Sequence, residues 1–157
     1  MGGEALLVST GGKRNEKELT NDQINEATAY AVLLGMPADR TYYVGYDFTA
    51  YGYIFDVLRI GTDVLPLDTR VKNPNSNISM KGAIAHEVVG HREAAMSGLT
   101  QSEDLLEEVQ ASIRAARFAP GLSKIEQSDL IRDAIFRLKE NNIAIRSVKE
   151  MLHIKER

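Results

Sequence analysis

One segment of β-type composition lies between segments with helical periodicity, and this order limits the folds open to the chain. Residues 41–67 are rich in Tyr, Val, Ile and Phe, and Gly45, Gly52 and Gly61 divide them into two to four short strands. On both sides, apolar residues recur at helical spacing. Strands gathered in one stretch, with helices in the remainder, predict an α+β fold in which a small twisted sheet packs on a helix.

Capping residues and helix breakers set the expected helix boundaries. Thr20 with Gln23 and Ser123 with Glu126 form capping boxes, and Ser79 is a further N-cap. The sequence predicts five helices, over residues 20–34, 79–98, 102–118, 123–140 and 145–152.

The ends of this pattern give the domain boundaries. Because Pro66 cannot donate to a strand ladder, the last strand, from Gly61 to Leu67, is expected at an edge of the sheet. The glycine-rich start predicts a flexible linker over residues 1–18, or the scar of a cut from a longer polypeptide. Residues 19–157 then form one domain.

Composition excludes several classes of function. The chain is 43% hydrophobic and 26% charged, as globular domains are, and its net charge of −3 without a basic block argues against nucleic-acid binding. No apolar run approaches the ~18 residues of a membrane span, so no membrane partner is expected. Cysteine is absent, which excludes disulfides and thiolate ligands. Any bound metal must therefore use His, Asp or Glu.

The second predicted helix carries the candidate chemistry. We interpret the segment His86-Glu-Val-Val-Gly-His91 as an HExxH motif, which places two imidazoles one helical turn apart on the same face. Two nitrogens can then share one zinc ion. Glu87 follows the first ligand directly and is placed to act as the general base.

A catalytic zinc ion needs a third protein ligand. The next helix supplies adjacent carboxylates, Glu107 and Glu108, which point about 100° apart. An antiparallel helix pair would bring one of them over the histidines, but periodicity alone does not choose between them.

The motif resembles the gluzincin pattern, in which HExxH is followed by ExxA and a small polar or acidic residue on the next helix. Glu108-Val-Gln-Ala-Ser112 matches the second part. The resemblance implies a minimal zincin-like fold, with His86, His91 and Glu108 as the Zn²⁺ ligands and Glu87 as the catalytic residue. In most gluzincins, an Asp or Asn at the last position of this motif supports the first histidine ligand. This chain has Ser112 at that position.

A longer resemblance covers about residues 55–155. The stretches Arg59-Ile-Gly-Thr-Asp, Asn73 to Gly82 and Gln110 to Phe118 are similar to zincin-like C-terminal toxin domains of bacterial polymorphic toxins, which end long proteins with Rhs or YD repeats. This implies a zinc metalloendopeptidase that is secreted as part of a larger bacterial protein and cuts a protein in a target cell. It also implies an immunity protein as partner.

Two alternatives to this function stay open. The domain could be a self-processing protease that acts on its own parent chain, or a non-catalytic module that holds a structural metal ion. A metal site buried from solvent would favour the non-catalytic module.

Further expectations concern substrate binding. Five of the six tyrosines lie between Tyr42 and Tyr53, and one of them is a candidate donor to the oxyanion of the transition state. The same segment is the expected surface for the immunity protein. We also expect the substrate to add as a strand along residues 61–67. His153, near the C-terminus, is left out of the site.

Overall fold

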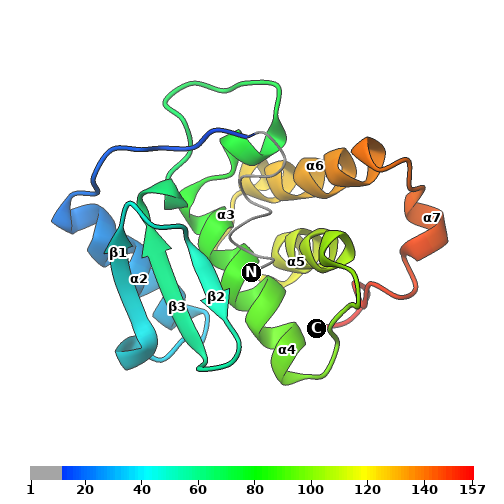
Figure 1. Ribbon diagram of the computed structural model, residues 1–157, viewed down its shortest axis with the longest axis horizontal. Coiled ribbons are helices and arrows are strands. Elements are labelled where there is room, and N and C mark those ends of the chain that lie inside the picture. Colours follow the sequence, from blue (N-terminus) through cyan, green and yellow to red (C-terminus); the bar gives the residue numbers. More distant parts are fainter. Residues whose placement is uncertain (1–11) are drawn as a thin grey trace.

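The computed structural model describes residues 12–157 and confirms an α+β fold (Figure 1). A small sheet lies on one side of the molecule, a long helix runs beside it, and two more helices pack on the far side of that helix. The elements are α2 (Asn21–Leu33), η1 (Ala38–Arg40), β1 (Thr41–Gly45), β2 (Ala50–Gly52), β3 (Val57–Gly61), η2 (Thr62–Val64), η3 (Pro74–Asn77), α3 (Met80–Ala85), η4 (His86–Arg92), α4 (Glu93–Met96), α5 (Asp104–Phe118), α6 (Lys124–Glu140) and α7 (Ile145–Val148).

Helices occupy all five predicted segments. Both capping boxes form: Thr20 accepts from the backbone N–H of Gln23, and Ser123 accepts from that of Glu126. The predicted second helix is continuous from Met80 to Met96, through α3, η4 and α4. The last helix is shorter than expected and ends at Val148.

The sheet has three strands in the order β1-β3-β2. β1 pairs with β3 in parallel and β2 pairs with β3 in antiparallel register, with Tyr51 opposite Leu58. β3 is therefore the central strand, so the prediction of an edge strand over residues 61–67 was wrong. The chain leaves the sheet at Gly61 and continues as the helical turn η2. The outer strand next to the long helix is β2 (Figure 1).

The prediction of a flexible linker over residues 1–18 was wrong for residues 12–18, which the structure describes. Arg14 is only 7% exposed, and its guanidinium donates to the backbone carbonyls of Asp63, Val64, Asn75 and Ile78. Burial lowers the pKa of Arg14 to about 10. Residues 12–18 are thus anchored to the domain, whereas residues 1–11 lie outside the described part of the chain.

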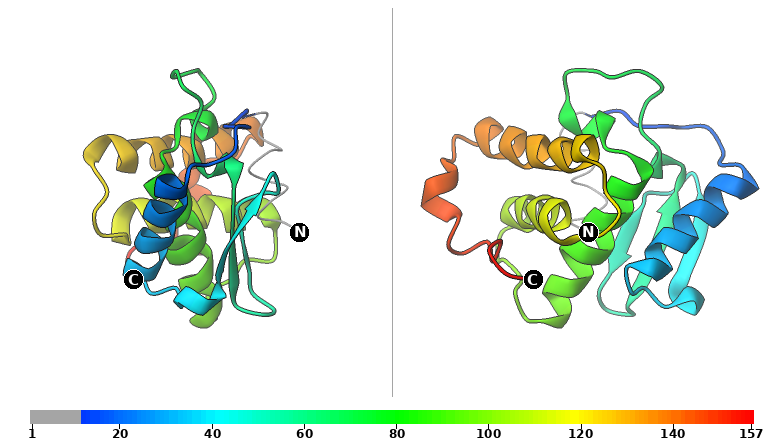
Figure 2. Two further views of the ribbon diagram at one scale, coloured as in Figure 1. Left: turned by 90° about the vertical axis from the view of Figure 1, so that its left-hand side faces the viewer. Right: turned by 180° about the vertical axis from the view of Figure 1, so that it is seen from behind.

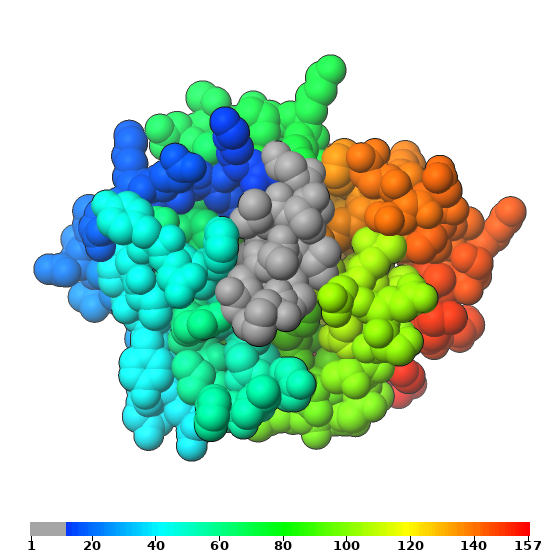
Figure 3. Space-filling view, in the orientation of Figure 1, coloured from blue at the N-terminus to red at the C-terminus, as the bar shows by residue number. Residues whose placement is uncertain are grey.

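Two apolar clusters hold the domain together. The larger one joins α2, the sheet, α3 and η4, and α2 covers one face of the sheet (Figure 2). The smaller one joins α5, α6 and the C-terminal segment through Leu106, Val109, Leu138 and Leu152. In the space-filling view, the strands and the α5–α6 pair lie on opposite sides of the visible face (Figure 3). The η4 helix packs against α5 and lies where the two clusters meet.

Candidate metal centre

The two histidines of the motif are five residues apart, not four. Three residues separate Glu87 from His91, so the motif is HExxxH and the interpretation as HExxH was wrong by one residue. In an α-helix, residues five apart point about 140° away from each other. The structure resolves this mismatch because η4 is a π-helix, in which residues five apart share a face.

The π-helical turn brings the imidazoles together. The Nε2 atoms of His86 and His91 lie 3.1 Å apart, and the two rings meet edge to face. At the end of the turn, the backbone N–H of Glu93 donates to the carbonyl of Val88, five residues earlier. The helix thus places both histidines as the sequence interpretation expected, but by a different helical geometry.

The third ligand comes from α5, which crosses η4 at close range. A Cβ atom on Gly90 would lie 2.5 Å from the backbone oxygen of Ala111, so only glycine allows this approach. Glu108 lies one turn before Ala111. Its carboxylate oxygens are 2.9 Å from His86 Nε2 and 3.0 Å from His91 Nε2.

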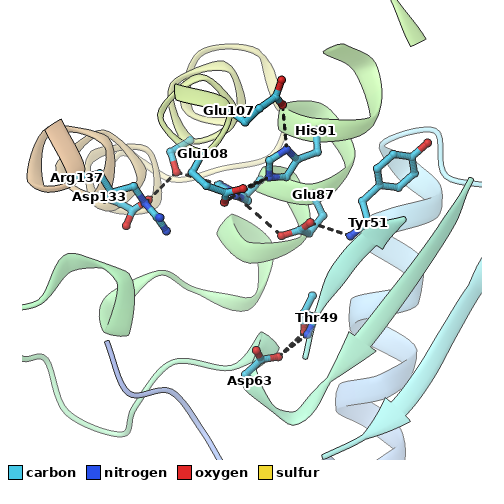
Figure 4. Close-up of polar contacts among 11 residues, drawn as sticks. Thr49, Tyr51, Asp63, Glu87, His91, Glu107, Glu108, Asp133 and Arg137 are labelled. Carbon is cyan, nitrogen blue, oxygen red and sulfur yellow. Dashed lines mark hydrogen bonds and ion pairs between the residues drawn. The ribbon is translucent and has the colours of Figure 1, made fainter. Parts of the chain in front are cut away.

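Glu107 takes a different position. Its Oε2 is 3.8 Å from the other ring nitrogen of His91, Nδ1, and its Oε1 accepts from the backbone N–H of Gln101. Of the two carboxylates that the sequence left open, the structure brings Glu108 to both imidazoles (Figure 4).

The ligand atoms fit a small divalent metal ion. Tetrahedral coordination with metal–ligand bonds of about 2.0–2.1 Å requires ligand atoms about 3.3 Å apart. The two Nε2 atoms are 3.1 Å apart, Glu108 Oε1 is 2.9 Å from His86 Nε2, and Glu108 Oε2 is 3.0 Å from His91 Nε2, so each contact is close to that value. His86 and Glu108 are each 1% exposed, so a cation bound by them would be shielded from solvent and would offset the cost of burying their polar groups.

The charges of the group depend on one another. Burial favours the neutral form of Glu108, but the two imidazoles outweigh it and hold the pKa of Glu108 well below its ordinary value. Burial alone lowers the pKa of His91, but the neighbouring carboxylates of Glu108 and Glu107 raise it by more. The pKa of His91 therefore lies well above its ordinary value. The acidic residues therefore favour positive charge between them, which a metal ion supplies.

Glu87 lies beside the three ligands and contacts only His86 among them, at the limit of an ion pair. Its Oε1 accepts a 2.9 Å hydrogen bond from the backbone N–H of Tyr51 on β2. Its Oε2 is 4.0 Å from His86 Nε2 and has no hydrogen-bond partner among residues 12–157. Burial raises the pKa of Glu87, which is 1% exposed. One carboxylate oxygen is thus fixed and the other is free to exchange a proton.

Four tyrosine hydroxyls donate to groups other than the three ligands. Tyr51 donates to Asp56, which also binds Arg92, and burial together with Asp56 raises the pKa of Tyr51 to about 12. This contact ties the β2–β3 turn to the end of η4. The hydroxyls of Tyr30, Tyr42 and Tyr43 bind Pro120, Asp39 and Glu18. The expected tyrosine donor to the oxyanion thus stays a prediction, and each of these four hydroxyls already donates its proton elsewhere.

A chain of polar residues behind His86 was not foreseen in the sequence. Ser112 Oγ lies 2.9 Å from His86 Nδ1, so Ser112 contacts the first histidine as the resemblance implied. Ser112 also donates to Asp133 on α6, which pairs with Arg137. Its only sign in the sequence is that Asp133 and Arg137 are four residues apart, a spacing at which opposite charges commonly pair on a helix.

Comparisons with known protein families, with curated proteins and with solved structures give no match to this chain. Within residues 12–157, every helix is too short or too polar to cross a membrane.

Proposed function

We propose that the domain is a zinc-dependent metallopeptidase. One observation carries the proposal: His86, His91 and Glu108 converge within hydrogen-bond distance of one another, beside the buried carboxylate of Glu87 (Figure 4). His and carboxylate ligands without cysteine suit zinc in a hydrolytic site. When bound, zinc supplies a Lewis acid that polarises a carbonyl group and lowers the pKa of water.

Glu87 is the proposed general base. The Tyr51 N–H holds Oε1, which leaves Oε2 to accept a proton from water and to return it to the leaving amine. Burial raises the pKa of this carboxyl toward the range in which it can do both. Because β2 is the outer strand beside Glu87, we place the peptide substrate along β2 rather than along residues 61–67.

The resemblance to toxin domains makes a protein of a target cell the proposed substrate, with secretion in a larger bacterial protein. An immunity protein is the proposed partner, and the exposure of Tyr42, Tyr46 and Tyr53 supports its binding to the tyrosine-rich segment. The departure from HExxH means that this resemblance rests on Glu108 to Ala111 and on the longer stretches of sequence.

A Glu87→Gln substitution tests the proposed activity. The amide has nearly the same shape but cannot take a proton, so zinc should stay bound while peptide hydrolysis falls by roughly 10²–10⁴-fold. Glu93→Gln, on the same helix but paired with Arg157, is the matched control and should keep its activity. Hydrolysis that is equal in Glu87→Gln and wild type would exclude Glu87 as the base.

Growth of bacteria that express the domain in the cytosol tests the toxin proposal separately. Wild type should stop growth, Glu87→Gln should not, and co-expression of the immunity protein should restore growth. Zinc-loaded wild type that is harmless in both cytosol and periplasm would contradict a toxin and favour self-processing, while the hydrolytic activity could still stand.

A second candidate is a structural metal centre in a binding module. The burial of His86, Glu87 and Glu108, each 1% exposed, favours it because a catalytic site must admit substrate. In that case, zinc would bind, no peptide would be hydrolysed, and Glu87→Gln would change only stability.

A further inference from the structure

A buried chain of hydrogen bonds leads from the proposed metal centre into α6 (Figure 4). His86 Nδ1 is 2.9 Å from Ser112 Oγ, Ser112 Oγ is 2.7 Å from Asp133 Oδ2, and Arg137 Nε donates to the same oxygen over 3.0 Å. All four side chains are at most 2% exposed. The chain therefore connects three helices by direct contacts between side chains.

Its hydrogen bonds can run in only one direction. The Asp133 carboxylate, paired with Arg137, only accepts, so the Ser112 hydroxyl must donate to it. The oxygen of Ser112 then accepts from His86, which puts the ring proton on Nδ1. Nε2, on the other side of the ring, faces Glu108 and His91 and is the nitrogen left to bind a metal ion.

Packing alone does not account for this chain. Asp133 is fully buried, and its Oδ1 has no hydrogen-bond partner within residues 12–157. Apolar residues of similar volume would join α5 to α6 at no such cost, because burying charged groups carries a large desolvation penalty. The polar residues are explained if they act on His86.

We infer that Ser112 and Asp133 are positioning residues of the metal centre, which fix the ring proton of His86 on Nδ1. The inference rests on the proposed zinc site and adds α6 to it. Asp133 acts only through Ser112, so the two residues should work in series. Arg137 donates to the Asp133 carboxylate and orients it.

Zinc dissociation constants of variants test the inference. Ser112→Ala removes the partner of Nδ1 and should weaken zinc binding about 10–100-fold. Asp133→Ala should weaken it at least as much, because it removes the acceptor of the Ser112 hydroxyl, which can then turn and donate to His86 Nδ1. In the double variant, the loss should not exceed that of Asp133→Ala.

Asp129→Ala is the matched control. Asp129 is 3% exposed on the same helix and is paired with Arg70 and Arg132, far from any contact with His86. This substitution should lower stability while leaving the zinc dissociation constant within about twofold of wild type.

The ¹⁵N shifts of the His86 ring in the metal-free protein give a reading that a purely structural role would not change. Nδ1 of His86 should carry a proton in wild type and none in Asp133→Ala. The same protonation of Nδ1 in both proteins, or unchanged zinc affinity in folded Ser112→Ala, would overturn the inference. Failure of the proposed zinc site would give a different result, because wild type would then bind no zinc. The ¹⁵N shifts of the metal-free protein would still show whether Ser112 and Asp133 fix the ring proton of His86.

Discussion

His86 and His91 are five residues apart in the chain, yet their Nε2 atoms lie 3.1 Å apart across one π-helical turn. The π-helix is therefore part of the ligand geometry. A π-helical turn inside an α-helix accommodates one extra residue while the α-helices on either side, here α3 and α4, continue.

This relationship predicts the effect of changing the spacing. Deleting Val89 leaves the histidines four residues apart, and an α-helix then puts them on one face, so we expect zinc binding to be retained. Inserting an alanine between Val88 and Val89 puts them six apart, which neither helix accommodates, and should abolish binding. Isothermal titration with zinc distinguishes the two. Tight binding by the insertion variant would contradict the role of the π-helix.

The choice of third ligand gives a second prediction. Glu108→Gln should weaken zinc binding by more than the roughly 10–100-fold that changes to ligand-supporting residues cost, because Glu108 contacts both imidazoles. Glu107→Gln should cost about tenfold or less, since Glu107 lies 3.8 Å from His91 Nδ1. Competition with a chromophoric chelator measures both. The reverse order of effects would make Glu107 the ligand.

Gly90 should tolerate no side chain. Gly90→Ala would place a Cβ atom 2.5–2.7 Å from the backbone and Cβ of Ala111, so α5 must move away and take Glu108 with it. We expect a loss of about 1–3 kcal/mol in the free energy of unfolding and weaker zinc binding. Helix propensity alone predicts the opposite sign, because alanine normally stabilises a helix relative to glycine. Stabilisation measured in urea would therefore refute the close approach.

The pH dependence of stability should include a contribution from Glu126. Burial alone raises the pKa of Glu126, but hydrogen bonds from Ser123 and Ser79 outweigh it and leave the pKa below its ordinary value. An acid of this kind stabilises the fold above its unfolded pKa of about 4.3, and the effect is lost as pH falls through the folded pKa.

Glu126→Gln should accordingly lower the free energy of unfolding at neutral pH by less than the ~1 kcal/mol of a lost cap, because the amide can keep the capping contact, as Gln23 does, but loses the hydrogen bonds to a charged group. The difference from wild type should shrink as the pH is lowered below about 4. Urea unfolding at several pH values checks this, and a constant difference across the range would show that ionisation of Glu126 plays no part.

Local signals accounted for much of the fold. Thr20 and Ser123 began their helices where the capping boxes predicted, because a cap depends only on residues within one turn. The order of the strands depends on pairing between distant segments, which is why β3 was misplaced at an edge. Arg14 binds four backbone carbonyls from two separate segments, and no side-chain pattern marks such partners.

The candidate site was predictable in its ligands and less so in its geometry. His86, Glu87, His91 and Glu108 were identified from residue type and resemblance, and the structure brings them together. The spacing of five between the histidines was itself a sign of a π-helix. Asp133 lies 25 residues beyond Glu108 in the sequence, and only the packing of α6 on α5 places it behind Ser112.

Zinc content after dialysis tests the central claim most directly. The account predicts about one zinc ion per wild-type chain, because three protein ligands hold a single tetrahedral ion, and almost none in His91→Ala, which keeps only two of them. Elemental analysis of both proteins, purified side by side, gives the answer. Wild type without zinc, or His91→Ala with as much zinc as wild type, would contradict a metal centre built on the π-helical histidine pair.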